Sequence, residues 1–227
     1  MIKKIIEKLH PTYKGKFAGT EFEVNNWDLS AFIVRKIIPV VGVHPFPLNE
    51  LSLMVAAVAG ANPTHIFEWG THIGKSARIF YETCKFLNMD TEIHSVDLPD
   101  DVQHVEHPHS KRGKLVKGKK NIFLHQGDGV NVSLDIYKNL NKEARVLFYL
   151  DGDHSYETVY RELFSIISTV KNPHVVLHDT FYQSPESCYN TGPAMAIENA
   201  IKQFSQIKFK RIETKTGLPG MTYLYTI

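Results

Sequence analysis

The segment "EWGTHIGKS", residues 68–76, combines residue types that suit a ligand carrying a positively charged amino group. It follows an apolar run and reads acid-x-Gly-x-x-x-Gly-x-Ser. Glycines at such a turn let a ligand approach the backbone, and the start of a following helix offers unpaired N–H groups to a negative group. A carboxylate here would repel a pyrophosphate but attract an ammonium group. We therefore expect a ligand to be held by Glu68, Gly70, Gly74 and Ser76, with a plain strand-to-helix turn as the alternative.

Later apolar runs also end on polar residues. Asp97 closes "HSVD", 23 residues after Gly74, and Asp128 lies in "QGDG". The segments "DGDHSYE" and "HDT" then supply Asp151, His154, His178 and Asp179. In open α/β sheets, ligands bind beyond the carboxyl ends of the strands, so we expect all these side chains to meet at one edge of a sheet.

The chemistry at these positions indicates a nucleoside ligand with an amino acid attached. A carboxylate at Asp97 can accept hydrogen bonds from both ribose hydroxyls, and Asp128 can accept one from an adenine amino group. S-adenosylmethionine carries all of these groups. The G-x-G-x-x-G fingerprint of dinucleotide-binding loops is missing. A dinucleotide-dependent oxidoreductase is therefore disfavoured, although it stays open together with a non-catalytic domain of the same fold.

The segments that must position these residues alternate between strand-like and helix-like patterns. Short apolar runs predict strands at residues 65–69, 92–97, 121–126, 146–151 and 174–179. Helical periodicity is found over residues 74–87, 155–171 and 192–204. Ser155 is a plausible N-cap, and Pro193 suits a first helical turn. A further helix over 47–60 should lead into the first strand.

The end of the chain departs from this alternation. "FKRIETK" and "MTYLYTI" are two strand-like runs joined by "TGLPG", which is too short for a crossover helix. These two strands should therefore pair antiparallel. The predicted fold class is α/β: a doubly wound, seven-stranded, mostly parallel sheet whose last strand is reversed.

The bulk composition restricts the function further. The chain of 227 residues is 43% hydrophobic and 22% charged, which is typical of one large globular domain or one domain with an added segment. A net charge of +2 gives no reason to expect nucleic-acid binding. We find no apolar run long enough to span a membrane and no secretory signal. Two cysteines, Cys84 and Cys188, favour reduced thiols and a cytoplasmic location, and a homo-oligomer is left open.

From residue 47 to 227 the chain resembles the class I S-adenosylmethionine-dependent methyltransferases. "EWGTHIGKS" looks like their first motif, "VDLPD" like their ribose-binding acid and "QGDG" like their adenine-side motif. "LDGDHSYETV" followed by "VVLHDT" resembles the branch with small-molecule and sugar O-methyltransferases and cephalosporin-hydroxylase-like proteins. The resemblance implies a methyltransferase domain over 47–227. Residues 1–46 have a different, Lys-rich and Pro-spaced pattern, and we expect them to form a cap over the strand ends, on the substrate side. The resemblance also implies that the cofactor is held by Glu68, Gly70, Gly74, Ser76, Asp97 and Asp128.

Methylation of a hydroxyl group needs a base, or a metal ion that acidifies the hydroxyl. His154 is the first candidate base and Asp153 the second, with a helix-capping role as the alternative for His154. The resemblance implies a divalent cation such as Mg²⁺ bound by Asp151, His178 and Asp179, and the metal-free site remains open. Asp151 is thus assigned to both the catalytic and the metal set. An N-methyltransferase is the alternative, although the amine-methylating N/D-P-P-Y signature is missing.

The acceptor itself is expected to be a small molecule. The stretch "HSKRGKLVKGKK", residues 109–120, holds six Lys and Arg residues and no acid, so it is either a solvated loop or a site for an anionic acceptor. A metal site among His104, His107 and His109 is a further alternative. Acceptor specificity should reside in residues 1–47, 100–120 and 181–192, which show the least regular pattern.

Overall fold

A computed structural model describes residues 26–102, 109–184, 186 and 189–226, and its centre is a single sheet. Seven strands lie in the order β3-β2-β1-β4-β5-β7-β6. Their bounds are β1 His65–Trp69, β2 Glu92–Asp97, β3 Ile122–Gln126, β4 Val146–Leu150, β5 His174–His178, β6 Phe209–Glu213 and β7 Met221–Thr226. The strand order reverses between β1 and β4, so the carboxyl ends of these two strands border the crevice in which this fold type binds ligands.

The predicted fold class is confirmed. Strands β1 to β5 pair parallel, whereas β7 pairs antiparallel with both β5 and β6. The five parallel strands agree with the predicted ranges to within one residue at each end. All five residues of β4 are buried, because helices cover both faces of the sheet there.

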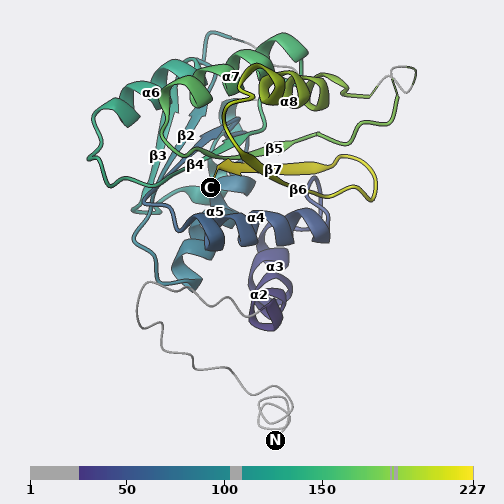
Figure 1. The fold of residues 1–227 in the computed structure, drawn as a ribbon. Coiled ribbons are helices and arrows are strands. Elements are labelled where there is room, and N and C mark those ends of the chain that lie inside the picture. Colours follow the sequence, from purple (N-terminus) through teal and green to yellow (C-terminus); the bar gives the residue numbers. More distant parts are fainter. Residues whose placement is uncertain (1–25, 103–108, 185, 187–188, 227) are drawn as a thin grey trace, which may run out of the picture.

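Helices pack on both sides of the sheet (Figure 1). One side carries α4 Leu48–Ala61 and α5 Lys75–Phe86, and the other carries α6 Gly129–Lys138, α7 Tyr156–Thr169 and α8 Gly192–Gln203. Two apolar cores result, one on each face. Four of these helices match the predictions, and Ser155 caps α7 by accepting a hydrogen bond from the backbone N–H of Thr158. Helix α6 was not predicted.

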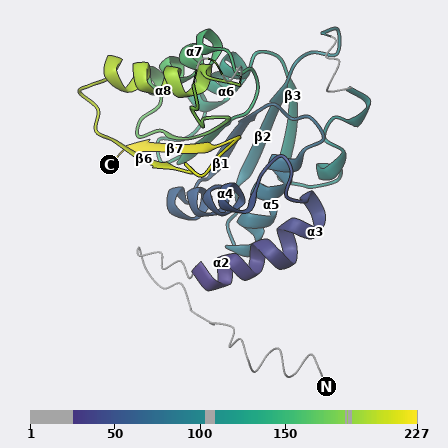
Figure 2. The same cartoon turned by 90° about the vertical axis from the view of Figure 1, so that its right-hand side faces the viewer.

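An outer layer of helix precedes α4. It comprises α2 Asn26–Phe32, the π-helical turn η1 Ile33–Ile37 and α3 Ile38–Val41. Figure 2 shows α2 and α3 on the outside of α4 and α5, away from the sheet, and Leu29 and Phe32 join the core on that side. The predicted cap also includes residues 1–25, which lie outside the described residues, so its place over the strand ends stays a prediction. The connection that follows α3 approaches those ends, since Phe46 packs edge-on against Tyr149 and His178.

Two short 3₁₀ turns, η2 His109–Lys111 and η3 Lys114–Val116, lie between β2 and β3. In the part of the chain that the structure describes, no helix is both long and apolar enough to cross a membrane.

Candidate functional site

The loop after β1 owes its shape to two glycines. Gly70 has a φ of +102°, and a Cβ atom there would lie 2.3 Å from the backbone oxygen of Asp151. Gly74 has a φ of +84°, acts as the N-cap of α5 and packs against Val116. The path of the chain itself therefore requires both glycines. Their contact with a cofactor is a second role, which stays a prediction.

Glu68 lies under this loop with its side chain fully buried. The hydroxyl of Ser76 donates a hydrogen bond to its Oε1 atom. Its Oε2 atom is buried without a hydrogen-bond partner among the described residues. Burial raises the pKa of Glu68 to about 7, although the hydrogen bond from Ser76 opposes the shift. A buried carboxylate oxygen that lacks a donor fits the ammonium group of the expected cofactor.

Asp97 ends β2 and is held in place by several donors. Its Oδ2 atom accepts from the backbone N–H of His72 at 3.2 Å and from Nε of Arg112 at 3.1 Å. Its Oδ1 atom accepts from the backbone N–H of Leu98 at 2.9 Å. Arg112 also pairs with Asp100. Each carboxylate oxygen has more than one lone pair, so Asp97 retains capacity for ribose hydroxyls.

Asp128 is the N-cap of α6. Its Oδ1 atom accepts from the backbone N–H of Asn131 at 2.9 Å, and Oδ2 pairs with Arg161 at 2.8 Å. The adjacent Gly129 lies against the ring of Trp69, where a Cβ atom would approach to 2.6 Å. Capping and packing thus account for the "QGDG" motif, and the adenine contact of Asp128 stays a prediction.

The basic stretch 109–120 is anchored to the glycine loop. The backbone N–H of Gly113 donates to the carbonyl of His72 at 2.8 Å, and that of Leu115 donates to Ile73 at 3.0 Å. Burial of Val116 against Gly74 completes the contact. The stretch is therefore part of the wall beside the predicted cofactor loop. Its exposed lysines are Lys111, Lys114, Lys117 and Lys120. Of the predicted histidine metal site, His104 and His107 lie outside the described residues.

The ends of β4 and β5 bring four titratable side chains together, as predicted. We call Asp151, His154, His178 and Asp179 the strand-end cluster. His154 Nε2 lies 3.0 Å from Asp179 Oδ2 and 3.7 Å from Asp151 Oδ1. His178 Nδ1 lies 2.9 Å from Asp179 Oδ2 and 3.1 Å from Asp151 Oδ1. Asp179 has a φ of +57°, and backbone conformations of this uncommon kind concentrate at functional sites.

Three atoms of the cluster surround a space that suits a cation. Asp151, His154 and Asp179 each offer one ligand atom, and these atoms lie within 4.8 Å of one another. His154 Nε2 is buried, and no aligned hydrogen bond reaches it from the described residues. Both ring nitrogens of His178, in contrast, face carboxylates, because its Nε2 lies 3.0 Å from Oε2 of Glu50. The three atoms that lie close enough to share an ion therefore include His154, whereas the predicted metal-ligand role of His178 stays a prediction.

The charges in this cluster are strongly coupled. Burial lowers the pKa of His178, but the carboxylates of Asp151, Asp179 and Glu50 outweigh it and hold that pKa well above 6.5. Burial also lowers the pKa of His154, but Asp151 and Asp179 outweigh burial, so the net shift of this pKa is upward. Burial raises the pKa of Asp179, but the hydrogen bond and charge of His178 bring it to about 2. A cationic His178 between ionised carboxylates is the resulting state.

Sequence reasoning missed the residues that orient this cluster. The hydroxyl of Tyr149 donates to Asp151 Oδ2 at 3.1 Å, and that of Tyr189 donates to Asp179 Oδ1. The amide of Asn190 lies 3.2 Å from His154 Nδ1. Glu50 gave one sequence signal, because it is the single acid in the mostly apolar segment "PLNELSLMVAAVAG", residues 47–60. The other three had no signal, because their partners lie in other segments.

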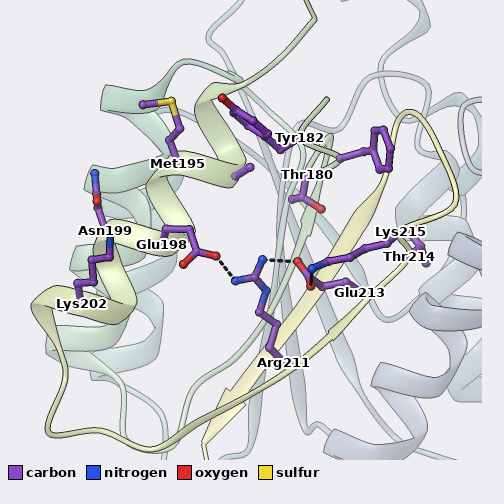
Figure 3. Close-up of a pocket in the computed structure, with 12 residues that line it drawn as sticks. Thr180, Tyr182, Met195, Glu198, Asn199, Lys202, Arg211, Glu213, Thr214 and Lys215 are labelled. Atoms are coloured by element: carbon purple, nitrogen blue, oxygen red, sulfur yellow. Dashed lines mark hydrogen bonds and ion pairs between the residues drawn. The ribbon is translucent and has the colours of Figure 1, made fainter. Parts of the chain in front are cut away.

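A pocket of about 540 Å³ opens next to the cluster, between α8 and the edge strand β6 (Figure 3). Thr180 and Phe181, which follow Asp179 directly, are among the residues that line it. Arg211 projects from β6 into its centre and pairs with Glu198 of α8 and with Glu213. The remaining lining residues are Tyr182, Ala194, Met195, Asn199, Lys202, Thr214 and Lys215. The volume is in the range of small-molecule sites.

Comparison with known proteins gives a consistent result. The family described as Rhamnosyl O-methyltransferase/CmcI matches residues 42–224. No curated protein sequence matches the chain.

Several solved structures share the fold. An O-methyltransferase from Bacillus cereus in complex with SAH aligns with a TM-score of 0.56 at 10% identity, covering 100% of this chain and 97% of that one. TomG from Streptomyces achromogenes, an O-methyltransferase of tomaymycin synthesis in complex with SAM, has a TM-score of 0.56 at 11% identity and coverages of 98% and 96%. CalS11, a TDP-rhamnose 3'-O-methyltransferase of calicheamicin biosynthesis, has a TM-score of 0.55 at 15% identity and coverages of 98% and 92%.

Proposed function

Because the chain belongs to the Rhamnosyl O-methyltransferase/CmcI family, we propose that its strand-end cluster activates one hydroxyl group of a small-molecule acceptor. The chain is an S-adenosylmethionine-dependent O-methyltransferase. The family therefore does not support the three alternative functions, which were an oxidoreductase, a non-catalytic domain and an N-methyltransferase. The observation that carries the proposal is the convergence of Asp151, His154 and Asp179 within 4.8 Å at the carboxyl edge of the sheet.

The cofactor would be held on the β1–β2 side of the crevice. S-adenosylmethionine supplies the methyl group on a sulfonium, which leaves the protein the tasks of alignment and proton removal. Glu68 would bind the ammonium group through its unsatisfied Oε2, and Asp97 would accept from the ribose. Gly70, Gly74, Ser76 and Asp128 would complete the cofactor site as the sequence predicts.

A divalent cation would be held by Asp151, His154 and Asp179. Such an ion lowers the pKa of a bound hydroxyl group and fixes its direction of attack. Two carboxylates and one imidazole suit Mn²⁺, Fe²⁺ or Zn²⁺ better than Mg²⁺. His178 would then act as a positioning residue, because its Nδ1 atom contacts the carboxylates of both Asp151 and Asp179. In the metal-free alternative, His154 removes the proton of the acceptor's hydroxyl group and Asp179 orients the acceptor.

The pocket between α8 and β6 would receive the body of the acceptor. Glu198 and Glu213 can accept from hydroxyl groups, while Arg211 and Lys202 can donate to them. Tyr182 is 47% exposed and offers an aromatic face for the apolar side of a ring. These features favour a hydroxyl-rich acceptor such as a sugar. The basic stretch 109–120 lies beside the glycine loop and not beside this pocket. An anionic group of the acceptor would therefore have to extend across the crevice to contact the basic stretch.

The test is an acceptor screen with labelled S-adenosylmethionine, run with EDTA-treated protein and again after addition of Mn²⁺ or Mg²⁺. We expect label in a sugar or other polyhydroxyl acceptor, and a metal-dependent rate. Activity that survives EDTA and does not rise on adding metal would decide for the metal-free site. His154→Ala should then be the most damaging change in the cluster. Transfer to amines alone would contradict the proposal.

The free, buried thiol of Cys84 fits a reducing compartment, so a cytoplasmic location remains part of this proposal. The absence of nucleic-acid and membrane partners and the division at residue 47 stay predictions, and a homo-oligomer stays open.

A further inference from the structure

A second group of metal-ligating side chains lies at the opposite end of the sheet. His65 is the first residue of β1, and it pairs in register with Glu92, the first residue of β2. His94 follows two positions later on β2, so its side chain projects from the same face as that of Glu92. The strand-end cluster follows the other ends of the parallel strands. This group, which we call the His65–Glu92–His94 site, therefore has no part in methyl transfer.

The spacing of its three ligand atoms is close to that of a metal centre. Glu92 Oε2 lies 3.7 Å from Nε2 of His65 and 3.5 Å from Nε2 of His94. One ligand atom from each residue lies within 4.8 Å of the others. Bonds of about 2.0–2.1 Å at a tetrahedral angle separate two ligands by roughly 3.4 Å. The carboxylate is thus within a few tenths of an ångström of its final position.

A hydrogen bond holds the ring of His65 in place on the side away from this space. The Oγ1 atom of Thr64 lies 2.9 Å from Nδ1 of His65, and it also contacts the carbonyl oxygen and the backbone N–H of Arg145, each at 3.1 Å. In the tautomer with its proton on Nδ1, His65 donates to Thr64 and presents the lone pair of Nε2 to the space beside Glu92. A second contact that orients the ring and sets its tautomer is typical of metal-ligating histidines.

His94 directs its Nε2 atom into the same space from a buried position. Its side chain is 8% exposed and stacks between Phe67 and Phe123. Its Nδ1 atom lies 3.1 Å from Nε2 of His125, whereas its own Nε2 has no hydrogen-bond partner among the described residues. Burial, with His125 and His65 nearby, lowers the pKa of His94 to about 4, so the ring is neutral.

Two imidazoles and a carboxylate thus converge on one space, an arrangement that a cation stabilises. We propose that His65, Glu92 and His94 bind a divalent transition-metal ion, with Zn²⁺ the best match, which joins β1 to β2. Imidazole nitrogen selects such ions over Mg²⁺ or Ca²⁺. The Glu92 side chain is 51% exposed, which leaves the fourth position open to water. The two rings lie within 11° of parallel, so binding requires one of them to turn about χ2.

The test measures binding of Co²⁺ and Zn²⁺ to the untagged protein in an Asp179→Asn background, which removes a ligand of the strand-end cluster. Co²⁺ reports geometry through its visible absorption, and Zn²⁺ affinity follows from competition with a chromogenic chelator. We expect one equivalent of Co²⁺ with a four-coordinate spectrum. Glu92→Gln and His65→Gln should each weaken binding at least tenfold. Glu143→Gln, at an exposed loop position, is the matched control and should bind as the parent does.

A thermal readout separates this site from the catalytic one. Zn²⁺ should raise the Tm of the parent and of Glu143→Gln but not that of Glu92→Gln. In the otherwise unsubstituted enzyme, Glu92→Gln should leave the methyl-transfer rate unchanged. The metal-binding and Tm readouts do not depend on the proposed function, so they test this site even if that function is wrong. Because Glu92 is largely exposed, its substitution should leave the apo fold intact, with circular dichroism as the check. Equal affinity and an equal Co²⁺ spectrum in the parent, Glu92→Gln and His65→Gln would overturn the proposal.

Discussion

The Nε2 atom of His178 lies 3.0 Å from Oε2 of Glu50, although 128 residues separate them in the chain. Both side chains are almost completely buried. The other oxygen of Glu50 accepts from the backbone N–H of Gly220 at 2.8 Å. One carboxylate thus joins α4, the end of β5 and the start of β7, directly behind the strand-end cluster.

Glu50→Gln should destabilise the fold strongly. The amide can still accept from Gly220, but it leaves His178 with one carboxylate fewer in a buried place. Removing one partner of a buried ion pair costs about 3 kcal/mol, measurable by urea unfolding. Glu82→Gln, which breaks the half-buried pair with Arg78 on α5, is the control and should cost well under 1 kcal/mol. Equal losses would show that Glu50 contributes only a surface-like interaction.

Much of the fold was readable because it rests on local pattern. Strands such as β4 show as unbroken apolar runs, and Ser155 lies in a sequence context that marks a helix start. Helix α6 was missed because "GVNVSLDIYK" contains β-branched residues and turn formers that mask its period. The place of residues 26–41 also depended on packing between distant segments, which no local pattern records.

In the candidate site, too, local patterns were predictable and contacts between distant segments were not. Each residue of the strand-end cluster was found from its position after a strand. Which histidine faces the carboxylates on both sides was not predictable, because that depends on Glu50, far away in the sequence. The glycines of the first loop were recognised by spacing. Their immediate cause, contact of Gly70 with the backbone of Asp151 and of Gly74 with Val116, became apparent only in three dimensions.

Asp97→Ala should weaken binding of S-adenosylmethionine by roughly 1.5–3 kcal/mol, because the ribose loses a charged acceptor. Arg112→Ala tests the support behind it, since Arg112 contacts Asp97 but would not itself contact the ribose. We expect a smaller loss for that variant. Calorimetric titration measures both. A folded Asp97→Ala protein with an unchanged Kd would show that Asp97 serves only to anchor Arg112 and to cap the strand.

Glu198→Gln should raise the KM for the acceptor about tenfold, equivalent to about 1.4 kcal/mol. The substitution removes one of the two carboxylates that fix Arg211 in the pocket. The kcat value and the affinity for S-adenosylmethionine should hardly change, because α8 does not border the cofactor side. Glu143→Gln is again the control. A fall in kcat with an unchanged KM would place the acceptor elsewhere.

Glu162 on α7 should make the fold less stable as the pH rises. It is 7% exposed, and burial raises its pKa from the ordinary 4.5 to about 8, with Asp153 and Asp128 adding to the shift and Arg161 opposing it. A group whose pKa is raised on folding binds a proton more tightly in the native state. Its contribution is therefore complete below about pH 4.5 and is lost progressively up to about pH 8.

Within that window each pH unit removes about 1.4 kcal/mol of stability through this residue alone. Glu162→Gln keeps the shape of the protonated acid and removes its titration. Urea unfolding between about pH 5 and about pH 9, which covers most of this window, should therefore show a shallower decline. Glu68 also has a raised pKa, of about 7, so part of the slope remains in the variant. Glu143→Gln should retain the full slope. A pH dependence identical in Glu162→Gln and the parent would show that the Glu162 carboxylate is solvated in the native protein.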